Sequence, residues 1–139
     1  MIDNNCAYCV EGDLVAKFGI KICELETSKV YLFKEQSHPG RCIVAHKKHV
    51  GDMNELTAEE RAAYFEDVAR VARAIMKAFN PDKVNYGAYG DTGHHLHFHL
   101  CPKYKDEYEW GGVFLMNPDK KYLTDAEYTE MIEKIKANL

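Results

Sequence analysis

Hydrophobic residues alternate with polar ones along the first third of the chain, in three short runs. The runs are rich in valine, isoleucine, leucine and aromatic residues, a composition typical of strands. Thr27-Ser28 and His38-Pro39-Gly40 separate them, and such residues favour turns. The pattern therefore predicts an antiparallel meander of strands within residues 13–25, 29–34 and 41–46.

The hydrophobic period changes to three and four residues between positions 57 and 79, which predicts a long helix. Thr57 and Glu60 form a capping-box pattern at its start, and Thr124 with Glu127 marks the start of a C-terminal helix. The positions expected to be buried are Phe65, Val68, Ala72, Ile75 and Phe79 in the long helix, and Tyr128, Met131, Ile132 and Ile135 in the C-terminal one.

Strand-like alternation returns over residues 84–89 and 95–101, on either side of a Gly90-Asp91-Thr92-Gly93 turn. The fold class predicted is α+β: an antiparallel β-sheet meander with one long central helix and a C-terminal helix. No repeat, low-complexity tract or linker divides the sequence, and 139 residues suit one domain, expected to span 1–139.

The formal net charge of -4 argues against binding of nucleic acid by broad phosphate neutralisation, so any phosphate site must be local. No apolar run approaches the roughly 18 residues of a membrane span, and the segment Met1-Ile2-Asp3-Asn4-Asn5-Cys6 lacks a signal-peptide pattern. We expect a cytoplasmic protein with neither nucleic acid nor membrane as partner. Five cysteines, an odd number, favour reduced thiols or metal ligands over disulfides.

Three histidines occupy alternate positions in His95-Leu96-His97-Phe98-His99. Because side chains alternate between the two faces of a strand, the three imidazoles should share one face at intervals of roughly 6.6–7 Å. Two chemistries suit such a row: metal binding in a hydrolase, and nucleophilic and proton-transfer catalysis of phosphoryl chemistry. The turn at 90–93 favours the second, since such turns can present N–H groups to a phosphate.

Cys6-Ala7-Tyr8-Cys9 is a C-x2-C unit. In a cytosolic chain this spacing is typical of a metal site or, beside a βαβ pattern, of a redox pair. No βαβ pattern follows it. A zinc ion would need about two more ligands. The candidates are His46, His49, His94 and His95.

Together these residues resemble the histidine-triad family of hydrolases and transferases, whose motif H-φ-H-φ-H-φ-φ reads here His95-Leu96-His97-Phe98-His99-Leu100-Cys101. The likeness extends over nearly the whole chain and includes Pro39-Gly40 and His46-Lys47-Lys48-His49-Val50. It implies that His95, His97 and His99 are catalytic, with His97 attacking the α-phosphate of a nucleotide. Water would then hydrolyse the covalent nucleotidyl-histidine, and no catalytic metal is required.

The resemblance also implies a set of phosphate-binding residues. Thr92 matches a serine or threonine that bonds the phosphate, and Gly90 opens the phosphate turn. Asn85 looks like an asparagine or glutamine near the scissile bond, although one residue is missing between it and Gly90. Many members carry a histidine where Arg41 stands; arginine is no acid or base near neutral pH, but its fork suits phosphate. Arg41 either stabilises charge in the site or is a solvated residue at a strand edge.

Members that begin with C-x2-C resemble the uridylyltransferase branch, which implies a structural zinc ion. The corresponding ligands are Cys6, Cys9, His49 and His95. The resemblance further implies a homodimer whose sheets continue across the interface, and a purine nucleotide or dinucleotide as substrate. The leaving group stays open among phosphoramidates, adenylates and dinucleoside polyphosphates. Two alternatives are a nucleotide-binding regulatory module with little turnover and a zinc hydrolase that uses the triad as ligands.

Overall fold

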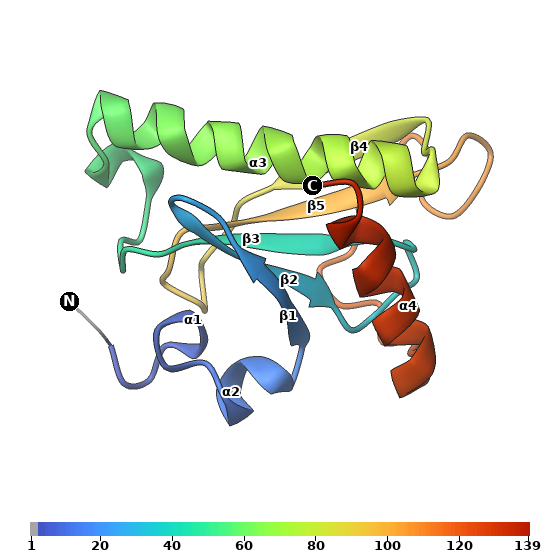
Figure 1. The fold of residues 1–139 in the computed structure, drawn as a ribbon, viewed down its shortest axis with the longest axis horizontal. Helices are drawn as coiled ribbons and strands as arrows, with labels where there is room; N and C mark the ends of the chain where they lie inside the picture. The colour runs from blue at the N-terminus through green and yellow to red at the C-terminus, as the bar shows by residue number, and fades with distance from the viewer. Residues whose placement is uncertain (1–2) are drawn as a thin grey trace.

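The computed structural model describes residues 3–139 and places helices on both faces of a five-stranded antiparallel sheet (Figure 1). The strands are β1 (Gly19–Glu24), β2 (Ser28–Phe33), β3 (Cys42–His46), β4 (Lys83–Gly87) and β5 (His97–Lys103). Their order is β1-β2-β3-β5-β4, so the strand that carries the histidine row lies between β3 and the edge strand β4. Met1 and Ile2, the start of the segment tested for a signal peptide, lie outside the described residues.

Helix α3 (Ala58–Phe79) lies along one face of the sheet, and the short helices α1 (Ala7–Val10) and α2 (Asp13–Ala16) lie on the other (Figure 1). A 3-10 turn, η1 (Met53–Glu55), precedes α3, and α4 (Asp125–Lys136) follows the sheet. The predicted α+β class, the meander and the two main helices are confirmed. Within residues 3–139, no helix has the length and apolar character needed to cross a bilayer.

Both long helices begin at the capping boxes predicted from the sequence. The Thr57 hydroxyl accepts a hydrogen bond from the Glu60 N–H at 3.1 Å, and the Glu60 carboxylate accepts one from the Thr57 N–H at 2.8 Å. Thr124 and Glu127 repeat the arrangement at 3.2 and 2.9 Å. Each box satisfies N–H groups that have no partner within the helix, which fixes where the helix starts.

Alternation along the strands gives the sheet two different apolar faces. The face under α3 belongs to the larger core, which includes Val30, Val44, Leu100, Val71 and Ile75. The opposite face carries a smaller cluster of residues from β2, β3, α1 and α2: Tyr31, Phe33, Ile43, Tyr8 and Val15. Because β5 pairs Ile43 with His99, the histidine row shares this second face. The larger core stabilises the sheet and leaves the second face available for a site.

Three sequence expectations are wrong in detail. Residues 13–16 form helix α2, so the first strand begins only at Gly19. His95 precedes β5, which begins at His97. In α3 the buried face is turned away from Phe65, which is 39% exposed, whereas Tyr64 is fully buried. Tyr64 reaches the core because its hydroxyl donates to the carbonyl of Val44 at 2.8 Å, which satisfies the polar end of the ring.

Candidate functional site

A cavity of about 1010 Å³ opens on the sheet face that carries the histidine row. Its lining includes polar groups, among them His95, His97, His99 and the turn 90–93. It also includes apolar side chains: Phe18, Phe33, Ile43, Phe114 and Leu115. Its volume is at the upper end of the range of about 300–1,000 Å³ for small-molecule sites. The cavity therefore offers both polar groups and apolar surface to a ligand.

His97 presents a nucleophilic nitrogen. Its Nδ1 lies 2.6 Å from the carbonyl oxygen of His95. Because a carbonyl can only accept, Nδ1 carries the proton and Nε2 keeps its lone pair. Burial lowers the pKa of His97, and the hydrogen bond to His95 only partly offsets this, so the ring is neutral near pH 7. A neutral imidazole with an unprotonated Nε2 is the form that can attack phosphorus.

His99 lies beside His97 on the same face, with ring centroids 5.4 Å apart. Its Nδ1 is 3.1 Å from a guanidinium nitrogen of Arg41, which donates the hydrogen bond. Arg41 is fully buried, and its guanidinium lies 4.2 and 4.8 Å from the ring centroids of Phe33 and Phe114. The alternative of a solvated residue at a strand edge is therefore wrong. Arg41 contacts His99 but is not itself among the residues that line the cavity.

The turn predicted to bind phosphate lines the same cavity as His97. Gly90 has φ 87°, a backbone conformation that glycine adopts without strain, and the exposed Thr92 lies two residues further on. Asn85 pairs with Cys101 across β4 and β5, so it shares the face of the histidine row. It lines a smaller neighbouring hollow of about 300 Å³ rather than the main cavity.

A four-residue cluster that could hold a metal ion adjoins the cavity. The ligand atoms of Cys6, Cys9, His49 and His95 all lie within 4.8 Å of one another. Cys9 Sγ is 3.2 Å from His49 Nδ1, Cys6 Sγ is 3.3 Å from His95 Nδ1, and the two Nδ1 atoms are 3.1 Å apart. Zinc bonds of about 2.0–2.3 Å in a tetrahedron separate the ligand atoms by about 3.3–3.8 Å. The cluster thus has nearly the dimensions of a tetrahedral metal site.

The surroundings of His95 orient it toward this cluster. Its Nε2 donates to the carbonyl oxygen of His46 at 2.6 Å, which leaves the Nδ1 lone pair for a metal. Burial lowers the pKa of His95 to about 4, so the ring is neutral at neutral pH. Of the other candidate ligands, His46 packs against Tyr64 on the α3 side and His94 is exposed. The structure therefore brings His49 and His95 to the cysteines, whereas His46 and His94 lie outside the cluster.

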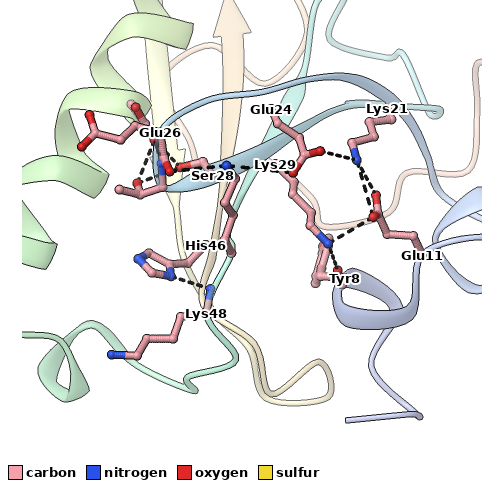
Figure 2. A network of polar contacts seen from close by, with 12 residues as sticks. Tyr8, Glu11, Lys21, Glu24, Glu26, Ser28, Lys29, His46 and Lys48 are labelled. Atoms are coloured by element: carbon pink, nitrogen blue, oxygen red, sulfur yellow. Dashed lines mark hydrogen bonds and ion pairs between the residues drawn. The ribbon is translucent and has the colours of Figure 1, made fainter. Parts of the chain in front are cut away.

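Tyr8 links the metal cluster to His97 and was not singled out from the sequence. It lies between the two cysteines, and its ring centroid is 4.9 Å from that of His97 and 5.3 Å from that of His95. Lys29 fixes α1 from the sheet, since its Nζ donates to the Tyr8 carbonyl at 3.0 Å and to Glu11 at 3.1 Å (Figure 2). In the sequence, the one feature that could have pointed to Tyr8 is its place inside the C-x2-C unit.

The role of the segment that follows β5 was also not predicted from the sequence. The carbonyls of Leu115 and Met116 accept hydrogen bonds from Arg41 at 3.0 and 2.9 Å. Glu109 holds this segment, because its carboxylate accepts from the Leu115 N–H at 3.0 Å and contacts His38 Nε2 at 2.6 Å. No local pattern in the sequence predicts these contacts, which join positions up to 75 residues apart.

The chain matches the family model described as "HIT domain" over residues 19–106. It is 29% identical over 141 residues to the adenosine 5'-monophosphoramidase hnt1 of Schizosaccharomyces pombe, with 95% of this chain and 99% of that protein covered. It is 28% identical over 98 residues to a bis(5'-adenosyl)-triphosphatase of Dictyostelium discoideum, with 67% and 65% covered. The sequence similarity thus includes two proteins named as hydrolases.

Solved structures share the fold. A histidine triad (HIT) protein from Sinorhizobium meliloti 1021 superposes with a TM-score of 0.84 at 22% identity, covering 92% of this chain and 95% of that one. A Zn-bound histidine triad family protein from Mycobacterium smegmatis has a TM-score of 0.67 at 21% identity, covering 95% and 94%. At these identities the likeness shows the fold alone.

Proposed function

The chain belongs to the histidine-triad (HIT) family, and from this premise we propose that it is a nucleotide hydrolase with His97 as its nucleophile. The observation that carries the proposal is the tautomer of His97. Donation of its Nδ1–H to the His95 carbonyl leaves Nε2 unprotonated on a ring that lines the cavity. The phosphate-type turn at 90–93 lines the same cavity, and two relatives are named as a phosphoramidase and a triphosphatase.

The reaction has two steps. The His97 Nε2 lone pair forms a bond to the α-phosphorus while the bond from phosphorus to the leaving group breaks, and that electron pair departs with the leaving group. A water molecule then attacks phosphorus, the N–P bond breaks and its electron pair returns to Nε2. The water proton passes to solvent, and a nucleoside monophosphate is released. N–H groups of the turn and the Thr92 hydroxyl stabilise charge on the phosphoryl oxygens.

The apolar part of the cavity lining suits the nucleoside. Phe18 and Phe33 offer aromatic surface to a base, and Ile43 lies on the sheet opposite His99. A purine nucleotide or dinucleotide fits this lining, with the α-phosphate at the histidines and the base against the aromatic rings. With the net charge of -4, a small nucleotide in a cavity is favoured over a nucleic acid held by an extended basic surface.

We assign zinc to the cluster of Cys6, Cys9, His49 and His95. Two thiolates and two imidazoles in tetrahedral spacing are a typical structural zinc set, and four protein ligands leave no position for substrate. A solved fold neighbour is described as Zn-bound. When bound, the ion would hold α1 against the end of the histidine row. The rival in which the triad itself binds the metal is disfavoured, since His95 directs its Nδ1 to the cysteines and Arg41 occupies the Nδ1 lone pair of His99. Of the three, His97 alone then keeps a ring lone pair for the cavity.

A homodimer through β4 is the assembly that the sheet favours. The β1 edge carries the ion pair Lys21–Glu24 and a bulge, features that hinder pairing with another strand. The edge strand β4 carries the exposed Tyr86, and Val113, which is 82% exposed, lines the same hollow as β4. A second copy would extend the sheet there. Light scattering at micromolar concentration should give twice the 16.0 kDa chain mass, and a monomer would reject this assembly.

The experiment that tests the function is rapid quenching with a labelled adenosine nucleotide, followed by peptide mass spectrometry. A nucleotidyl adduct should map to the peptide that contains His97. His97→Ala should lower kcat by several orders of magnitude and still bind nucleotide, because only the interaction made in the chemical step is lost. Tight nucleotide binding without turnover by the wild type would instead support the regulatory-module alternative. An adduct on another residue would reject the mechanism.

A further inference from the structure

Arg41 is a buried cation next to the proposed nucleophile, and among residues 3–139 its guanidinium contacts carbonyls, a ring nitrogen and aromatic rings rather than a carboxylate. The carbonyls of Leu115 and Met116 accept from it, and the rings of Phe33 and Phe114 flank it. Burying a charge without an opposite partner is costly, so the position suggests a use for both the charge and the donor. Among the three histidines of the row, Arg41 bonds His99.

The chemistry of the contact defines the His99 tautomer. Arginine can only donate, so His99 Nδ1 must accept the hydrogen bond of 3.1 Å with its lone pair. The His99 proton is then on Nε2, the nitrogen left for the cavity that the ring lines. Burial, the Arg41 charge and His97 lower the pKa of His99 to about 2, which agrees with a ring that stays neutral.

A ring held in this way can donate a hydrogen bond but cannot hand over its proton. Loss of the Nε2 proton would leave an imidazolate unless Nδ1 gained a proton at the same time. Nδ1 is occupied by Arg41, which keeps its own protons throughout the pH range of enzymes. When a P–N bond breaks, the departing amine takes the electron pair and needs a proton. A departing phosphate or carboxylate takes the pair as a stable anion and needs only hydrogen bonds.

We propose that Arg41 is a positioning residue that fixes His99 as a permanent Nε2–H donor, which makes the site selective for anhydride leaving groups over amines. This inference rests on the proposed hydrolase function and names its substrate class: nucleotides joined through the α-phosphate to a phosphate or a carboxylate. The segment of residues 104–117 contributes to this positioning, because the carbonyls of Leu115 and Met116 accept hydrogen bonds from Arg41.

The other charged and titratable groups around this pair are few. His97 faces His99 from the same strand, and Cys101 follows on β5. Glu35, Glu109 and Tyr89 act on Arg41 through space without contacting His99. Arg41 is the group that bonds the His99 ring directly, so its replacement should change the ring's protonation.

The tautomer is tested by nitrogen NMR of the zinc-loaded protein with labelled histidine. The His99 ring should remain neutral with its proton on Nε2 from pH 5 to 8. A His99 ring that titrates in this range, or that carries its proton on Nδ1, overturns the proposal with the wild type alone. Arg41→Met should let the ring change tautomer or titrate, whereas the exposed Arg73→Met should not. If Arg41→Met does not fold, Arg41→Lys, which keeps the charge, should show a weaker form of the same change.

The substrate class is tested by comparing diadenosine triphosphate with adenosine 5'-phosphoramidate. General acid catalysis is worth about 10²–10⁴-fold, so kcat/KM of the wild type should favour the anhydride by at least about 10²-fold. Arg41→His, whose ring can pass a proton to His99 Nδ1, should narrow this ratio by about 10-fold or more, and Arg73→Met should leave it unchanged. Equal turnover of both substrates by the wild type, or an unchanged ratio in Arg41→His, overturns the proposal. Turnover of neither would reject the hydrolase function itself, while the NMR result still decides the relation of Arg41 to His99.

Discussion

The ring of Tyr8 packs 4.9 Å from the ring of His97, although Tyr8 belongs to helix α1 and lies in sequence between the two cysteines of the metal cluster. The contact joins two parts of the molecule that the sequence presents as separate motifs. One is a C-x2-C unit near the N-terminus and the other is the centre of the histidine row. A structural change at the metal cluster should therefore alter the orientation of His97 through its contact with the Tyr8 ring.

Replacement of Tyr8 by alanine should impair turnover and stability together. The ring is buried, so its loss should cost about 3 kcal/mol of unfolding free energy and leave His97 able to turn from its productive orientation. We expect kcat/KM to fall about 10-fold in a zinc-loaded, folded sample. Tyr8→Phe, which keeps the ring, is the matched control and should stay near the wild-type value. Full activity of Tyr8→Ala would mean that the contact has no part in catalysis.

Removal of the metal should loosen the fold around α1 without removing a catalytic group. Elemental analysis of the purified protein should find close to one zinc ion per chain, and chelation should lower Tm, because metal binding is linked to folding. Turnover should decline partly and recover when zinc is added back. Cys9→Ser should lose the metal, whereas Cys23→Ala, which changes a cysteine outside the cluster, should retain it. Zinc near zero in all samples would refute the site.

The histidine row predicts that replacing neighbouring histidines by alanine lowers kcat to different extents. His99→Ala should lower kcat on the order of 10²-fold, because the variant loses the donor beside the phosphoryl group. His94→Ala is the natural control, since this exposed side chain precedes the row and belongs to neither the metal cluster nor the strand. His94 also lines the cavity, but its side chain is exposed and supplies neither the nucleophile nor the donor, so its loss should change kcat by less than about twofold. Similar losses in both variants would argue against a specific role for His99.

Stability should depend on pH through Glu35. Burial alone would raise the pKa of this carboxyl, but hydrogen bonds from the Ser37 hydroxyl and from the N–H groups of Ser37, Lys120 and Lys121, at 2.7–3.0 Å, hold it below its ordinary value. The carboxylate therefore stabilises the fold above its unfolded-state pKa of about 4.3 and loses that effect as pH falls through its lower folded pKa.

Glu35→Gln should accordingly cost about 1–3 kcal/mol at pH 7, where the charged acceptor is replaced by a neutral one. The difference from wild type should shrink at acidic pH, where the wild-type carboxyl is protonated as well. Urea denaturation at neutral and acidic pH measures this, with the exposed Glu66→Gln as control. A difference that is the same at both pH values would show that the charge of Glu35 is not the stabilising element.

The sequence by itself determined the elements and the reactive motifs. Capping boxes at Thr57 and Thr124 located both long helices, and strand alternation placed His97 and His99 on one face. These features are local, since hydrogen bonds and side-chain direction within an element depend on residues a few positions apart. The boundary of β1 and the position of Phe65 were missed, because both depend on contacts with other elements.

The tertiary structure alone decided which residues meet. Cys6 and His95 are 89 positions apart, and the choice of His49 over His46 as their neighbour follows from how β3 ends beside β5. The position of Arg41 behind His99, 58 residues away, likewise depends on the order of strands and on the segment that covers it. The type of a residue determines what chemistry its side chain can perform. Only the packing of elements distant in sequence sets the distances and the protonation states that select one chemistry among them.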